Sequence, residues 1–391
     1  MSGTQTKMRL ILAIAFLFGS GVHSADTDCK RDTIVVCYWG TWSVYREDIG
    51  HFTTNDIDPS LCTTIVYSFA GLGLNFEITN LDSWTDIDLG GFSNLTSLKE
   101  DYPCLKTTLA VGGWNEGSIK YSVMAYTEEG RKTFADSVLK FITYYGFDGI
   151  DLDWEYPTTR GGIPEDMQNF ASLVETIKQT ISPWNLTLTI AVPIDTSLIG
   201  SAYDIPSVKD TVDHVHLMTY DYSLPSTALV TGLSAPLSAI KETVSAWLEA
   251  GIPPEKLILG IPAYARTYTL VDDDHHDVGD PVTGAAEAGE YTQEAGFLAY
   301  YELQQILQDE FQKMTAVQTD DTNYAYGNEE WFTYETETTV RTKTQYALDN
   351  GLGGVMLWSI DNDDFQGLYG DKYTLLSTIN KVVNENKSRR K

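Results

Sequence analysis

The amino-acid sequence predicts an α/β fold, a (β/α)8 TIM barrel with an α+β insertion subdomain between strand 7 and strand 8. Three observations lead to this prediction. Eight short runs rich in apolar and β-branched residues recur along the chain, helical patterns lie between them, and the last two runs are unusually far apart. Strands that alternate with helices form parallel sheets, and eight such strands close into a barrel.

The alternative fold is a doubly wound open sheet. It does not need eight strands, and no glycine-rich phosphate-binding turn follows the first run. The eight predicted strands are Thr33–Tyr38, Thr63–Phe69, Leu105–Val111, Phe147–Trp154, Leu186–Val192, His214–Thr219, Leu257–Pro262 and Gly353–Trp358.

The clearest helical pattern covers Thr127–Tyr145. Thr127 is a suitable N-cap, apolar residues recur with helical spacing, and Gly146 follows as a C-terminal stop. Two further helices are predicted over Met167–Ile181 and Leu237–Ala250.

The insertion is predicted over about residues 266–335. This stretch holds 16 acidic residues and only two basic ones, Arg266 and Lys313, so its net charge is −14. A long acidic loop would explain the charge, but the stretch also contains many aromatic residues, enough for a small core of its own. We therefore expect a folded subdomain beside the barrel.

The N-terminus has the pattern of a secretory signal peptide. An apolar run over residues 8–21 begins beside Lys7 and Arg9, and the small residues Ser24 and Ala25 follow it. A membrane anchor is the alternative, but the run is short for a span. We expect a signal peptide over residues 1–24, a single domain over residues 25–391 with no further module attached, and a secreted, extracellular protein, with a lysosome as the other destination.

The charge of the mature chain limits its partners. Loss of Lys7 and Arg9 leaves 24 basic residues against 55 acidic ones, a net charge of 24 − 55 = −31. Nucleic acids and anionic lipids carry charge of the same sign, so we expect no nucleic-acid or membrane partner, and we expect a monomer.

The four cysteines, Cys29, Cys37, Cys62 and Cys104, lie in the first third of the chain. In an oxidising compartment they predict two disulfides, because their spacing does not suit a zinc site. Acceptor sequons for N-glycosylation occur at Asn94, Asn185 and Asn386.

The predicted carboxyl ends of the barrel strands carry aromatic, acidic and basic residues. Active sites of such barrels lie at this end. Aromatic rings stack on the apolar faces of sugars, and carboxylates and phenols bind sugar hydroxyls, so this end predicts a carbohydrate site. Core packing is the alternative for any single ring. The residues are Tyr38, Trp39, Phe69, Gly112, Gly113, Trp114, Glu155, Tyr156, Asp195, Tyr220, Asp221, Tyr264, Arg266 and Trp358.

The stretch "FDGIDLDWEYP", residues 147–157, contains the carboxyl groups that we expect to be catalytic. Side chains alternate along a strand, so Asp151, Asp153 and Glu155 point into the barrel. Burial and like charge raise the pKa of at least one of them, and a carboxyl that stays protonated near neutral pH is a general acid. Glu155 is nearest the mouth and is the expected acid, with Asp153 as its partner.

The same residues allow two alternatives to a catalytic role. A calcium site would need a loop with glycine and further oxygen ligands, which this stretch lacks, so we expect no metal and no cofactor. A structural ladder of acids would need basic partners, and Arg160 is the only one nearby in sequence.

With these residues in view, the chain resembles family 18 glycoside hydrolases, the animal chitinases and chitinase-like proteins. "FDGIDLDWEYP" matches the Asp-x-x-Asp-x-Asp-x-Glu signature of that family, and six further blocks occur in family order over nearly the whole mature chain. They are "VVCYWGTWSVYR", "CTTIVYSFAG", "TLAVGGWN", "LMTYD", "LGIPAYAR" and "GGVMLWSIDNDDF".

The resemblance implies a mechanism that uses one enzyme carboxyl and no enzyme nucleophile. Glu155 would protonate the glycosidic oxygen, and the 2-acetamido oxygen of the substrate would attack the anomeric carbon to give an oxazolinium ion. Asp153 would orient the acetamido group, with Asp151 below it, and Tyr220 would hold its carbonyl. The resemblance and the strand ends together give the substrate-binding candidates Tyr38, Trp39, Trp42, Phe69, Gly112, Gly113, Trp114, Tyr156, Met218, Asp221, Tyr264, Arg266, Trp331 and Trp358.

The chain also departs from the family pattern. A product-side tryptophan usually follows the Met-x-Tyr-Asp block, but here no tryptophan lies between Trp184 and Trp247. Cys37 and Cys62 match the first disulfide of the family. Cys29 and Cys104 do not match its later one, and because both precede barrel strands we expect them to pair with each other.

The expected function is that of a secreted, endo-acting chitinase that binds and cuts chitin or chitooligosaccharides. Two alternatives remain open. One is a non-catalytic or weakly catalytic chitinase-like lectin, which the presence of Glu155 disfavours. The other is an endo-β-N-acetylglucosaminidase that acts on the chitobiose core of N-glycans.

Overall fold

The computed structural model describes residues 29, 33–319 and 323–390. The helices and strands discussed below belong to one compact unit, residues 31–391. The predicted signal peptide, residues 1–24, lies outside the described residues.

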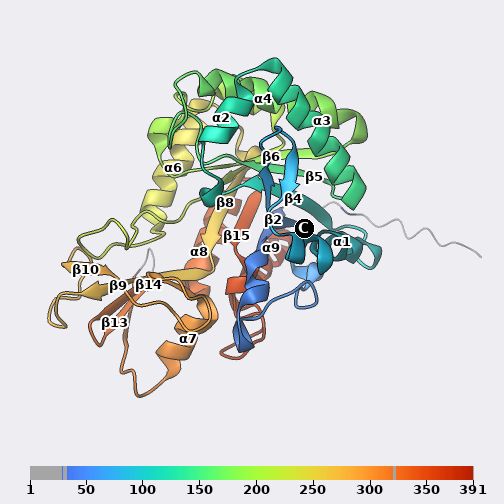
Figure 1. The fold of residues 1–391 in the computed structure, drawn as a ribbon. Coiled ribbons are helices and arrows are strands. Elements are labelled where there is room, and N and C mark those ends of the chain that lie inside the picture. The colour runs from blue at the N-terminus through green and yellow to red at the C-terminus, as the bar shows by residue number, and fades with distance from the viewer. Residues whose placement is uncertain (1–28, 30–32, 320–322, 391) are drawn as a thin grey trace, which may run out of the picture. The chain divides into compact units, whose positions relative to one another are not determined.

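Eight parallel strands form a closed barrel (Figure 1). The hydrogen-bonded order is β1-β15-β8-β7-β6-β5-β4-β2, and pairing between β1 and β2 closes the ring. This confirms the predicted barrel, and each predicted strand overlaps an observed one. The strands are β1 (Ile34–Gly40), β2 (Thr64–Leu72), β4 (Lys106–Gly112), β5 (Gly149–Asp153), β6 (Thr187–Val192), β7 (His214–Leu217), β8 (Leu257–Pro262) and β15 (Gly354–Trp358).

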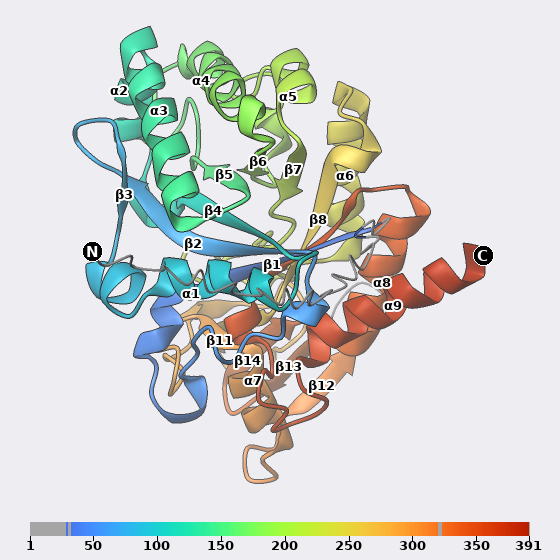
Figure 2. The same cartoon turned by 90° about the vertical axis from the view of Figure 1, so that its right-hand side faces the viewer.

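Helices surround the barrel (Figure 2). In α3, the Thr127 side chain accepts a hydrogen bond from the Gly130 amide, and Gly146 ends the helix in the left-handed conformation, as the sequence predicts. The helices are α1 (Gly91–Ser97), α2 (Ile119–Ala125), α3 (Glu128–Tyr145), α4 (Asp166–Ile181), α5 (Ile205–Thr211), α6 (Leu237–Ala250), α8 (Glu337–Asp349) and α9 (Thr374–Arg390).

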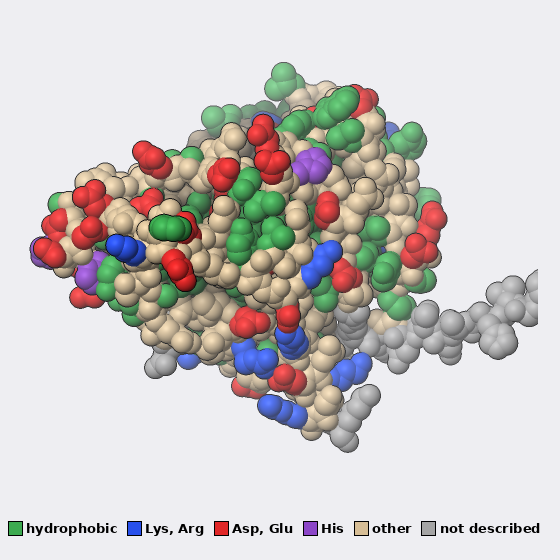
Figure 3. Space-filling model, turned by 90° about the horizontal axis from the view of Figure 1, so that it is seen from below, with side chains coloured by type: hydrophobic (Ala, Val, Ile, Leu, Met, Phe, Trp, Pro, Cys, Tyr) green, Lys and Arg blue, Asp and Glu red, His purple; other side chains and the backbone are tan. Residues whose placement is uncertain are grey.

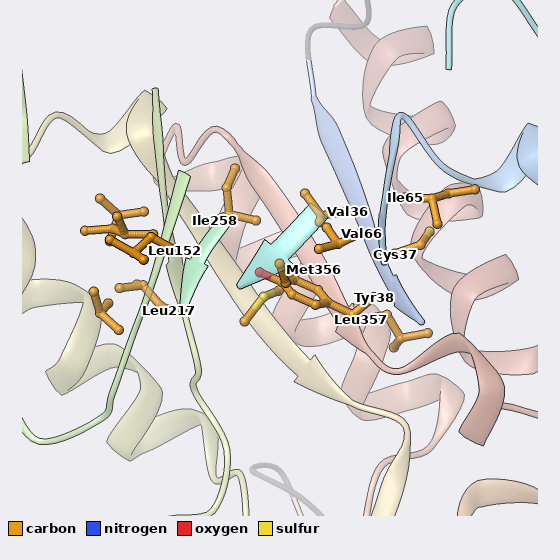
Figure 4. Close-up of a cluster of buried hydrophobic side chains, with 14 of the residues drawn as sticks. Val36, Cys37, Tyr38, Ile65, Val66, Leu152, Leu217, Ile258, Met356 and Leu357 are labelled. Carbon is orange, nitrogen blue, oxygen red and sulfur yellow. The ribbon is translucent and has the colours of Figure 1, made fainter. Parts of the chain in front are cut away.

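Alternation along the strands separates two environments. Trp154, between Asp153 and Glu155 in sequence, packs outward against Tyr121 of α2 and Phe170 of α4. Figure 4 shows part of the buried core, to which β1, β2, β5, β7, β8 and β15 contribute side chains. The outward residues therefore hold the helices on the barrel, which leaves the inward face of β5 to its carboxylates.

The insertion is a folded α+β element, as expected. Its sheet has the order β10-β9-β14-β13-β12, with β11 paired to β9, and α7 (Tyr300–Gln308) packs beside it (Figure 1). The face in Figure 3 shows many acidic side chains on the insertion side. The strands are β9 (Tyr264–Leu270), β10 (Val282–Ala285), β11 (Phe297–Ala299), β12 (Thr315–Gln318), β13 (Asn323–Gly327) and β14 (Glu330–Tyr334), and a short β3 (Ile78–Asn80) pairs with β2.

The insertion starts at the mouth of the barrel. Strand β9 begins at Tyr264, two residues after β8 ends at Pro262. The first residues of the insertion, Tyr264 and Arg266, therefore lie at the carboxyl end of a barrel strand.

The cysteines are oxidised. Cys37 on β1 and Cys62, just before β2, form a disulfide with a Cα–Cα distance of 6.0 Å. Cys29 and Cys104 are also disulfide-bonded, and their pairing with each other stays a prediction. Within the described ranges, no helix is long and apolar enough to span a bilayer.

Candidate active site

Asp151, on β5, is fully buried inside the barrel. Its carboxylate accepts hydrogen bonds from the Tyr38 hydroxyl of β1 at 2.8 Å and from the Thr189 hydroxyl of β6 at 2.5 Å. Burial raises the pKa of Asp151 to about 6, although both hydrogen bonds act to lower it. Because its partners come from β1 and β6, Asp151 is oriented across the barrel interior, as the alternation predicts.

His216 of β7 completes this network. Its Nδ1 lies 2.6 Å from the Tyr38 oxygen and 3.4 Å from Asp151 Oδ1. Burial lowers the pKa of His216 to about 3, so the imidazole is neutral. Tyr38 has one hydroxyl proton and donates it to Asp151, so His216 must carry its proton on Nδ1 and donate it to the Tyr38 oxygen. Two successive hydrogen bonds, from His216 to Tyr38 and from Tyr38 to Asp151, therefore stabilise the Asp151 carboxylate.

Asp153 and Glu155 lie above Asp151 towards the mouth. Both are buried, with exposures of 4% and 7%. Burial, and then the charges of Glu155 and Asp151, raise the pKa of Asp153 well above its usual value. Burial also raises the pKa of Glu155 to about 7, while a hydrogen bond from Tyr156 and the charge of Arg160 lower it and Asp221 raises it. The pair therefore retains a proton near neutral pH.

The two glycines at the end of β4 allow the backbone of β5 to approach. A Cβ on Gly112 would lie 2.0 Å from the Asp153 carbonyl oxygen, and Gly112 has a φ of 124°. The next amide, of Gly113, donates to the same carbonyl at 2.8 Å. A side chain at Gly112 would push Asp153 away, and one at Gly113 would press on the Phe69 ring, which explains why glycine is needed here.

Asp221 follows β7 and faces the start of the insertion. Its carboxylate accepts hydrogen bonds from Arg266 Nε at 2.8 Å and Nη2 at 2.6 Å, and from the Tyr264 hydroxyl at 2.9 Å. The neighbouring Tyr220 is buried and contacts the Tyr264 ring edge-on at 6.1 Å. Strand β9 thus fixes one side of the mouth through the bidentate Arg266–Asp221 pair.

An aromatic cluster forms another part of the mouth. Trp358, at the end of β15, contacts Tyr38, Phe69 and Trp42 with ring-centre distances of 5.5, 5.8 and 6.2 Å. Trp42 is 46% exposed and stacks on Phe69. Aromatic surface that reaches from the carboxylates to solvent suits the apolar faces of sugar rings.

The remaining predicted residues are Trp114, Tyr156 and Met218. Trp114 is 58% exposed, and the Arg160 guanidinium lies over its ring at 3.5 Å. Tyr156 and Met218 are partly buried.

Two predicted substrate contacts are wrong. Trp39 is 2% exposed because it alternates with the inward Tyr38 and packs against Phe52 and Tyr67. Trp331 is fully buried in the insertion, where its indole N–H donates to the His276 carbonyl. Neither ring offers a face to a sugar.

Sequence reasoning missed Thr189 and His216, and it assigned no role to Arg160. Thr189 and His216 are polar residues in the middle of apolar barrel strands, a signal that could have identified them. Arg160 lies in a loop, where its direction cannot be inferred from strand alternation.

Two other groups of predictions can be placed but not tested. Asn94 and Asn185 are exposed and Asn386 is half-buried, so glycosylation at these residues stays a prediction. Among the described residues, no group of three or more His, Cys, Asp or Glu side chains could hold a metal ion.

This geometry suits acid-catalysed cleavage of a sugar polymer. Glu155 retains a proton near neutral pH, the acidic side chains of Asp153 and Asp151 lie below it, and the aromatic rings provide surface for pyranose faces.

Comparisons with known proteins agree with this chemistry. The model of glycosyl hydrolases family 18 matches residues 34–363. "Probable chitinase 2" of Drosophila melanogaster is 37% identical, and the match covers 94% of this chain and 80% of that protein.

Solved structures that are similar to this chain include both a chitinase and a pseudo-chitinase. The group IV chitinase of Ostrinia furnacalis in complex with allosamidin is 40% identical, with a TM-score of 0.88 over 90% of this chain and 99% of that one. Human YKL-39, described as a pseudo-chitinase that retains chitooligosaccharide binding, is 30% identical, with a TM-score of 0.81 over 90% of this chain and 100% of that one. The chain belongs to family 18 of the glycosyl hydrolases.

Proposed function

We propose that this glycoside hydrolase is a secreted, endo-acting chitinase that hydrolyses β-1,4-linked N-acetylglucosamine polymers with retention of configuration. The observation that carries the proposal is the buried Glu155, whose raised pKa of about 7 leaves it able to donate a proton above the carboxylates Asp153 and Asp151. Chitin is the proposed substrate class because, in this mechanism, the enzyme supplies the acid and the 2-acetamido group of the substrate supplies the nucleophile.

The reaction begins with proton transfer from Glu155 to the glycosidic oxygen. As the C1–O bond breaks, the acetamido carbonyl oxygen of the same sugar attacks C1 from the opposite face and forms an oxazolinium ion. Asp153 accepts the acetamido N–H and stabilises the positive charge, and the Tyr220 hydroxyl donates to the acetamido oxygen. The Glu155 carboxylate then removes a proton from water, and the water oxygen attacks C1 as the C1–O bond of the oxazolinium ring breaks, which restores both the acetamido group and the acid.

The rest of the site holds the polymer. Trp358, with Trp42 and Phe69 beside it, provides stacking surface for the sugars on the non-reducing side. Trp114 provides a surface for the leaving sugar, while Asp221, fixed by Tyr264 and Arg266, faces the bond that is cut. The allosamidin complex and the chitinase names among the relatives support a chitin-like ligand.

A chitinase-like lectin is the main alternative, favoured by the similarity to the pseudo-chitinase YKL-39. An endo-β-N-acetylglucosaminidase that cuts N-glycans is the second. Incubation of the protein with chitopentaose and, separately, with an N-glycosylated protein distinguishes all three. We expect shorter chitooligosaccharides from the first incubation and an intact glycan in the second. Binding without products would support the lectin, and glycan release would support the third function.

The location and organisation of the chain belong to the same proposal. Cleavage after residue 24 would release residues 25–391 as a secreted catalytic monomer, with a lysosomal location as the alternative. Mass spectrometry of the N-terminus and of Asn94, Asn185 and Asn386 in protein collected from a culture medium tests the cleavage site and the glycosylation together.

A further inference from the structure

Arg160 links the proposed acid to the aromatic ring on the leaving side. Its Nη1 donates to the Glu155 carbonyl oxygen at 2.9 Å, and its Nη2 donates to the Trp114 carbonyl oxygen at 2.9 Å. The same guanidinium lies 3.5 Å from the centre of the Trp114 ring. One planar group therefore holds two main-chain segments and covers one face of an exposed indole.

The loop that carries Arg160 is itself well anchored. The Ser118 hydroxyl donates to the Tyr156 carbonyl at 2.9 Å and accepts a hydrogen bond from the Trp154 indole at 2.6 Å. The Gly162 amide donates to the Thr159 carbonyl at 2.8 Å. These bonds enclose Arg160 on both sides, so its guanidinium projects from a fixed base although the residue is exposed.

We propose that Arg160 is a positioning residue for the leaving side of the site: it fixes the plane of Trp114 relative to Glu155 and restricts the leaving sugar to the uncovered face of that ring. This inference rests on the proposed function.

The charge of Arg160 has a second consequence. The groups that act on the carboxyl of Glu155 are Asp153, Tyr156, Arg160 and Asp221, and the buried phenols Tyr203 and Tyr220 also face this set. Arg160 is the cation among them, and it lowers the pKa of Glu155. Loss of its charge should therefore move the high-pH limb of activity, where Glu155 loses its proton, to higher pH.

Three variants separate the contributions of charge and shape. Arg160→Met removes the charge and the donors but keeps an apolar stem. Arg160→Lys keeps the charge but not the planar fork. Lys132→Met is the matched control, because Lys132 is 69% exposed on α3 and its loss changes the net charge equally. Thermal unfolding of each variant checks that it folds.

Initial rates on chitopentaose are measured across pH for each variant, and again in a Trp114→Ala background. We expect kcat/KM to fall by about 5- to 20-fold in Arg160→Met, because misplacement of a bound group has effects of this order. The high-pH limb of activity should shift to higher pH in Arg160→Met. In Arg160→Lys this limb should stay in place, but kcat/KM should still fall. In the Trp114→Ala background, Arg160→Met should cost much less than it does alone.

The opposite results would overturn the inference. If a sugar must displace Arg160 to reach Trp114, Arg160→Met will raise kcat/KM. If Arg160 is only structural, the high-pH limb of activity will not move. The fold-changes in kcat/KM caused by Arg160→Met and Trp114→Ala will then be independent, so that they multiply in the double variant. Failure of the proposed function is distinguishable, because wild-type protein would then release no product at any pH. Calorimetric titration with chitopentaose would still compare the affinity of wild type with that of Arg160→Met.

Discussion

The hydroxyl of Tyr38 on β1 donates a hydrogen bond to Asp151 on β5 at 2.8 Å, across the interior of the barrel. This contact lies at the bottom of the site, below Asp153 and Glu155 and furthest from the mouth of the barrel. Because His216 donates to the Tyr38 oxygen, the phenolic proton is directed to Asp151 and supports its charged form.

Replacement of Tyr38 by phenylalanine tests this support. The hydrogen bond lowers the pKa of Asp151, so its loss should raise that pKa above about 6. Asp151 would then take up a proton at higher pH, and the low-pH limb of kcat should move upward with a fall in kcat of about tenfold. An unchanged limb in a folded Tyr38→Phe variant would show that Asp151 does not depend on Tyr38.

The burial of Glu155 predicts a stability effect that is separate from activity. Its pKa is raised from 4.5 to about 7, so the folded state disfavours the ionised form. Above pH 7, the free energy of unfolding of Glu155→Gln should therefore exceed that of wild type by up to about 3 kcal/mol. Its unfolding temperature should be higher as well. The gain should shrink as pH falls from about 7 to 4.5 and vanish below it. Equal stability at pH 8 and pH 4 would contradict the raised pKa.

The ion pair of Asp221 with Arg266 predicts a further change in pH dependence. Asp221 raises the pKa of Glu155, so Asp221→Asn should move the high-pH limb downward, opposite to the effect of Arg160→Met. It should also lower kcat/KM by about tenfold or more, because Arg266 loses its bidentate partner. Measurement of kcat against pH in both variants decides between this account and one in which the two charges act only on folding.

The Cys37–Cys62 disulfide should stabilise the start of the barrel. It joins residues separated by 25 positions, and a loop of that length corresponds to about 3 kcal/mol of stabilisation. The double replacement of both cysteines by alanine should lower the free energy of unfolding by that amount, measured by denaturant titration, with activity retained at low temperature. A loss below about 1 kcal/mol would indicate that packing around β1 and β2 alone fixes this end.

Most of the fold was predictable from the sequence because the barrel strands are short apolar runs, and β5 shows why the site was too. In β5, the period of two along a strand is sufficient to place Asp151 and Asp153 on one face. Trp39 illustrates the limit: it was assigned to the mouth by its place at a strand end, while alternation with Tyr38 sends it outward.

The partners of these residues were harder to predict. The contact of Asp151 with Thr189 depends on the register between the neighbouring strands β5 and β6, and its contact with His216 depends on how the barrel closes. Arg160 lies in a loop, where no periodicity gives its direction. Pairwise contacts between distant elements therefore needed the structure.

In the proposed mechanism, Glu155 donates the proton that breaks the glycosidic bond. The most direct test is the initial rate of chitopentaose hydrolysis by Glu155→Gln, with Glu165→Gln as control, because Glu165 is an exposed glutamate ten positions away. We expect a loss of about 10²- to 10⁴-fold or more in kcat for Glu155→Gln and none for Glu165→Gln. A folded Glu155→Gln variant with the turnover of wild type would contradict it.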